Sequence, residues 1–181
     1  MDLSITDPSH TELAAAYLQL VVTLGLVAVC VELRRRYRKA YFGAWAVAWG
    51  LFGLRLGAIV SFLHTGRPAW LFWHQVTTGW TALALLWAAL VFSRGARWRH
   101  WFWLLLLFPP VWSYVAIYRM DNFLLAAGPA VLFLSVATAW TAWAFFRYHR
   151  EVVSPAARFL AVVLALWALH HLDYPFLRAR G

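Results

Sequence analysis

Charged residues are scarce in this sequence. Lysine, arginine, aspartate and glutamate together make up 13% of the 181 residues, and only seven residues are acidic. A soluble domain carries about 25% charged residues. Hydrophobic residues make up 64% of the chain, and the mean hydropathy is +0.65. The composition therefore excludes an ordinary soluble domain and predicts an integral membrane protein.

Cysteine and catalytic motifs are nearly absent. The one cysteine, Cys30, excludes an internal disulfide and a multi-cysteine metal site. The chain has no Walker loop, no HExxH, no GxSxG and no kinase or cyclase motif. It also lacks the basic start and the cleavage site of a signal peptide. We therefore expect no enzyme activity from this chain, and any kinase or cyclase domain would lie downstream of it.

Long apolar runs fill the rest of the sequence. Each is about 18 to 24 residues long, enough to cross a hydrocarbon core about 30 Å thick. None alternates with the period of two that marks a membrane β-strand. The sequence predicts an all-α, polytopic bundle forming one domain over residues 1–181, with six transmembrane helices at about 11–33, 41–63, 69–92, 101–118, 123–146 and 155–174.

The distribution of basic residues predicts the orientation. Eleven of the sixteen lysines and arginines lie on one side, ten of them after the first, third and fifth runs and Arg158 at the start of the sixth, and four lie on the opposite side. Basic loops stay in the cytoplasm. We therefore expect the N-terminus and the C-terminus outside.

Three prolines lie inside predicted spans. Pro109 and Pro110 remove the amides that would bond to Leu105 and Leu106, and Pro129 does the same in the fifth span. Neighbouring helices can satisfy the freed carbonyls. Both a static kink and a bend that responds to a ligand remain open at this point.

Arg55 is a charge in the middle of an apolar run. It lies about eight residues, or roughly 12 Å, from the outer end of its helix. An arginine at that depth costs at least about 2.5–3.5 kcal/mol unless it is paired. Asp173 is the carboxylate best placed to pair with it, and bonds to helix carbonyls and water are the alternative.

Other polar side chains share the depth of Arg55. In the sixth run, His170, Asp173 and Tyr174 share one helical face, and His171 points about 100° away. Pro175 is expected to end that run. Shared depth predicts one ligand-binding site lined by Arg55, His74, Gln75, His170, Asp173 and Tyr174; the alternative is a set of separate interfacial anchors.

No cofactor is predicted from these residues. A divalent metal would draw its ligands from His74, His170, His171 and Asp173, although the spacing guarantees only two of the three or four ligands needed. A haem held between His74 and His170 is a second alternative, because two histidines on facing helices permit it.

Two stretches resemble a known class of membrane module. Tyr41 to Leu56 reads Y-F-G-A-W-A-V-A-W-G-L-F-G-L-R-L, and Trp167 to Arg178 reads W-A-L-H-H-L-D-Y-P-F-L-R. Together with the basic run before them, they resemble the multi-pass N-terminal sensor region of bacterial histidine kinases and of PAS/GGDEF diguanylate cyclases. The resemblance implies that His170, Asp173, Tyr174 and Pro175 are signature residues.

The resemblance also implies a function. We expect a sensory input module of a two-component or cyclic-dinucleotide signalling protein in the bacterial cytoplasmic membrane, sensing a periplasmic or membrane-borne ligand. Its partners would be the lipid bilayer, a downstream cytoplasmic signalling domain and a second copy in a homodimer, with no nucleic acid. Because the chain stops at Gly181, we expect a truncated seven- or eight-helix module. A haem- or metal-binding redox subunit and a small transporter are the alternatives.

Overall fold

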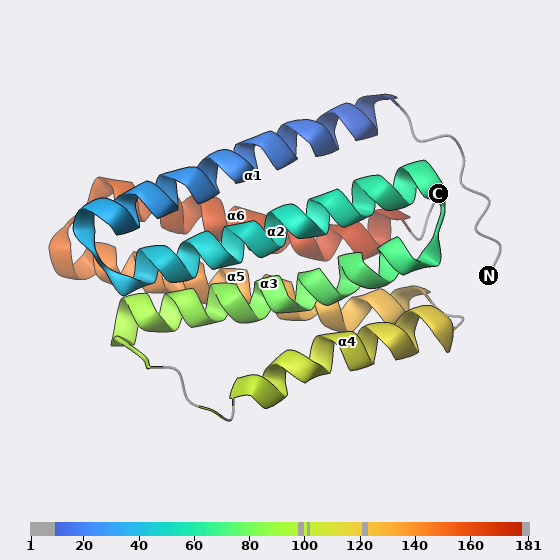
Figure 1. Ribbon diagram of the computed structural model, residues 1–181. Helices are drawn as coiled ribbons and strands as arrows, with labels where there is room; N and C mark the ends of the chain where they lie inside the picture. The colour runs from blue at the N-terminus through green and yellow to red at the C-terminus, as the bar shows by residue number, and fades with distance from the viewer. Residues whose placement is uncertain (1–9, 98–99, 101, 121–122, 179–181) are drawn as a thin grey trace.

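Six α-helices make up the part of the chain that the structure describes. The computed structural model describes the backbone of residues 10–97, 100, 102–120 and 123–178, and the side chains of 13–97, 100, 102–120 and 127–172 (Figure 1). The helices are α1 (His10–Tyr37), α2 (Ala40–Thr65), α3 (Pro68–Arg94), α4 (Phe102–Tyr118), α5 (Phe123–Val152) and α6 (Pro155–Arg178). The predicted all-α fold is confirmed.

The helices match the predicted spans within a few residues at most ends. Five of them are long and apolar enough to cross a membrane, and α4 is apolar but has only 17 residues. That length is at the lower limit for a spanning helix. Several helices run past the predicted boundaries: α1, for example, includes the basic residues Arg34 to Arg36. Hydropathy marks the apolar core of a helix, whereas the helix itself continues into the polar region.

The two ends of α6 differ in how they are formed. At its start, the backbone amide of Ala157 donates to Ser154 Oγ at 3.3 Å, so Ser154 caps the helix. At its end, the prediction that Pro175 stops the helix is wrong, because α6 continues to Arg178. A proline inside a helix removes one backbone hydrogen bond, here to the carbonyl of His171, and a membrane helix tolerates that loss.

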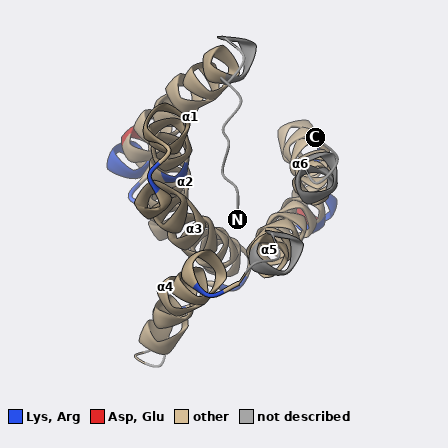
Figure 2. Cartoon of the chain, turned by 90° about the vertical axis from the view of Figure 1, so that its right-hand side faces the viewer, with Lys and Arg blue, Asp and Glu red and all other residues tan. Residues whose placement is uncertain are grey.

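The helices form an open arc when the bundle is viewed along its axis. The order around the arc is α1, α2, α3, α5 and α6, and α4 packs outside against α3 and α5 (Figure 2). The helix α1 contacts α2, and most of its apolar surface is exposed. In a membrane this apolar surface contacts lipid, so it carries none of the free-energy cost that exposure to water would bring.

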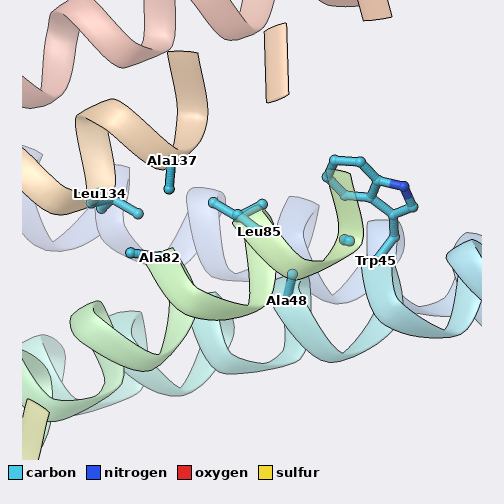
Figure 3. Close-up of a cluster of buried hydrophobic side chains, with 7 residues drawn as sticks. Trp45, Ala48, Ala82, Leu85, Leu134 and Ala137 are labelled. Carbon is cyan, nitrogen blue, oxygen red and sulfur yellow. The ribbon is translucent and has the colours of Figure 1, made fainter. Parts of the chain in front are cut away.

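Small side chains hold the centre of the arc together. The core of α2, α3 and α5 consists of Trp45, Ala48, Ala82, Leu85, Ala88, Leu134 and Ala137 (Figure 3). Four of these seven are alanines, which let helix backbones approach closely where apolar burial gives little drive for association. This packing fixes α2 and α3 as the rigid pair that carries Arg55 and His74.

The prolines of α4 are accommodated by α3. Trp80 Nε1 donates a hydrogen bond of 2.9 Å to the carbonyl of Leu106, the carbonyl that Pro110 deprives of its helical amide. One turn along, Gly79 faces Pro109, and a Cβ at Gly79 would lie 2.7 Å from Pro109 Cβ. The two contacts join α3 and α4, and the first supplies a donor to one of the two carbonyls that the prolines free.

Candidate functional site

Arg55 is bonded to a hydroxyl and not to a described carboxylate. Its Nε donates to Thr78 Oγ1 at 3.0 Å, and Thr78 Oγ1 donates in turn to the carbonyl of His74 at 2.7 Å. His74 Nδ1 lies 3.2 Å from the carbonyl of Arg55. Since a carbonyl only accepts, Nδ1 carries the proton of this hydrogen bond. The three residues therefore close a ring of hydrogen bonds between α2 and α3.

A row of aromatic rings leads from Arg55 to α6. The guanidinium carbon of Arg55 lies 5.1 Å from the ring centroid of Phe52. Phe52 meets Trp167 edge to face at 5.1 Å, and Trp167 lies 4.8 Å from the imidazole of His171. Trp49 adds a stacked contact with Trp167 at 5.5 Å. Side chains of α2 and α6 thus meet across the inside of the arc.

His171 is the histidine of α6 that points into the bundle. Its side chain is 7% exposed, whereas that of His170 is exposed. Ring contacts with Trp167 and Phe52 link His171 to the guanidinium of Arg55. The structure thus places the side chain of His170, a predicted site residue, at the surface, and that of the neighbouring His171 toward α2.

The rotation of α6 explains this difference. The buried positions of α6 follow a spacing of four and three residues: Ala157, Ala161, Leu164, Ala168 and His171. Ser135 of α5 donates a hydrogen bond of 2.8 Å to the carbonyl of Ala168, which joins α5 and α6 one turn before His171. The stripe of small residues was the sequence signal that could have identified His171, because small residues mark helix interfaces in membranes.

The other predicted site residues are either buried near His74 or lie outside the described part of the chain. Gln75 is buried beside His74 on α3. Outside the predicted set, His64 is exposed at the end of α2, with its Nε2 3.1 Å from the hydroxyl of Tyr17. The side chains of Asp173 and Tyr174 lie outside the described residues, so the pairing of Asp173 with Arg55 stays a prediction.

One ring nitrogen of this cluster has an unused hydrogen-bonding position. His171 Nε2 is buried and has no hydrogen-bond partner among the described residues. A buried imidazole nitrogen without a partner costs about 1–3 kcal/mol and calls for a water, an ion or a ligand. Within the same described part, no three histidine, cysteine, aspartate or glutamate side chains lie close enough together to hold a metal ion. The arrangement suits a polar group that exchanges hydrogen bonds with an imidazole beside a guanidinium.

Comparison with known proteins adds no identification. No family model matches this chain, and neither a curated protein nor a solved structure is significantly similar to it.

Proposed function

We propose that this chain is a membrane-embedded sensory module of a bacterial signal-transduction protein, and that its ligand binds between α2, α3 and α6. The observation that carries the proposal is the buried Nε2 of His171, which lacks a partner among the described residues and is linked to Arg55 through the rings of Trp167 and Phe52. Ionisable residues inside a membrane bundle line functional sites by default.

The chemistry of the site favours an amphipathic ligand with an anionic or hydrogen-bonding head. The guanidinium of Arg55 attracts an anion, and Thr78, His74 and His171 add polar contacts around it. The rings of Phe52 and Trp167 offer an apolar wall beside these groups. A ligand of this kind reaches the site by partitioning into the bilayer, which agrees with a membrane-borne signal.

The signalling part of the proposal is supported by the resemblance of 41–56 and 167–178 to the sensor regions of histidine kinases and diguanylate cyclases. Binding at a site shared by α2 and α6 would favour one spacing of these helices over another, and α6 is the helix nearest to any following domain. The gene sequence after Gly181 tests this part: a reading frame for a kinase or cyclase supports it, and a stop codon there contradicts it.

Ligand binding can be tested with a matched pair of probes. We expect laurate, a carboxylate, to raise the melting temperature of the full chain in nanodiscs, and dodecanol, which has the same chain and no charge, to have a smaller effect. At 100 times the dissociation constant the stabilisation is about 2.7 kcal/mol. The laurate effect should disappear in Arg55→Leu and in His171→Leu, and persist in His170→Gln. Equal effects of the two probes on every variant would contradict the site.

A further inference from the structure

An apolar groove lies outside the arc, between α2, α3 and α4. It has a volume of about 410 Å³, within the range of about 300–1,000 Å³ that is usual for ligand sites. Val47 and Leu51 of α2 form one wall, α3 contributes the stretch from Trp80 to Leu90, and the first turns of α4 form the other wall. Every side chain that lines it is hydrophobic.

The groove lies beside two helices of unequal length. With 27 residues against 17, α3 is longer by about 15 Å at 1.5 Å per residue. Gly79 and Pro109 hold the two helices together at one level, and α4 begins well short of the end of α3 (Figure 1). Trp87 meets Phe102 edge to face at 5.2 Å and closes the groove toward α4.

Positive charge follows the groove along the chain. Leu90 lines the groove, and Arg94 lies one turn further along the same face of α3. Gly95 then ends the helix in the left-handed conformation, with φ of 59°, and Arg97 follows two residues later. The side chains of Arg94 and Arg97 are exposed.

We propose that this groove is a specific site for one anionic phospholipid. The acyl chain lies along α3 between Trp80 and Leu90, and the phosphate contacts Arg94 and Arg97. The groove and Arg94 follow one another on α3, and Arg97 comes three residues later, so a single molecule with an apolar tail and an anionic head satisfies both. Basic pockets between helices at a membrane surface are a recognised place for anionic headgroups.

Native mass spectrometry of the full chain tests the proposal with dioleoyl phosphatidylglycerol and dioleoyl phosphatidylcholine as probes. We expect one phosphatidylglycerol to stay bound and to bind more tightly than phosphatidylcholine. Each arginine contributes about fivefold, so the preference is roughly 25-fold. Arg94→Gln with Arg97→Gln should remove the preference. Arg147→Gln with Arg150→Gln, an exposed pair at the end of α5, should keep it. Leu83→Trp, which fills the groove, should weaken the binding of phosphatidylglycerol in a protein whose melting temperature is unchanged.

Three results would overturn the proposal. Equal retention of the two lipids would mean that the groove holds bulk lipid only. An equal loss of preference in both arginine pairs would mean general attraction to a basic surface. A dimer that forms through α4 and excludes phosphatidylglycerol would mean that a second copy of the chain covers the groove.

Discussion

Gly79→Ala is expected to lower the melting temperature of the protein, whereas Gly50→Ala and Gly57→Ala should leave it unchanged or raise it. The new Cβ would lie 2.7 Å from Pro109 Cβ and 2.8 Å from Pro109 Cγ, atoms of a rigid ring that cannot move aside. Overpacking of this kind costs about 1–3 kcal/mol. At Gly50 and Gly57 no atom lies within 4 Å, so alanine only improves helix propensity.

Thermal unfolding in one detergent compares the three variants directly. In a protein of this size, each kcal/mol corresponds to about 2–4 °C. Gly79→Leu should be more damaging than Gly79→Ala, since more atoms must displace α4. If Gly79→Ala has the same melting temperature as Gly50→Ala and Gly57→Ala, then α3 and α4 do not approach closely at this level. The α3–α4 packing that lines the groove would then be contradicted as well.

Thr78→Val is expected to destabilise the bundle by about 1.5–3 kcal/mol, the usual range for a hydrogen bond to a charged group. Valine keeps the shape of threonine and removes the oxygen that accepts from Arg55 Nε. Thr77→Val is the matched control, because Thr77 is equally buried and its hydroxyl donates to carbonyls of its own helix, those of Trp73 and His74. Chemical or thermal unfolding in detergent measures both changes.

The difference between the two variants tests whether Thr78 is a hydrogen-bond partner of Arg55. Equal losses in Thr78→Val and Thr77→Val would mean that the hydroxyl of Thr78 matters only for its own helix. The role of Thr78 as the partner of Arg55 would then be contradicted.

The sequence predicted the depth of the polar residues better than their direction. Hydropathy places Arg55, His74 and the two histidines of α6 at one level, and the structure brings Arg55 and His74 into contact. Rotation about a helix axis is harder to predict, because in lipid both the buried and the exposed faces are apolar. His171 faces inward because the small residues of α6 do, and a pattern of alanines is a weaker signal than a pair of histidines.

One hydrogen-bond partner of Arg55 was difficult to predict. Its pairing with Asp173 stays a prediction, because that side chain lies outside the described residues. Within the described part, the hydroxyl of Thr78 on the adjacent helix accepts a hydrogen bond from Arg55 Nε. Threonines are common in membrane helices and most of those described here bond to their own backbone, so the exceptional one cannot be recognised without the helix packing.

The account depends most on the claim that Arg55 of α2 and His171 of α6 belong to one site. A double-mutant cycle with Arg55→Leu and His171→Leu measures their coupling in the free energy of unfolding, and the same cycle with His170→Leu is the control. We predict a coupling of at least about 0.5 kcal/mol for His171, and additive effects for His170 within about 0.3–0.5 kcal/mol. Additive effects for His171, or a coupling to His170 alone, would contradict the site.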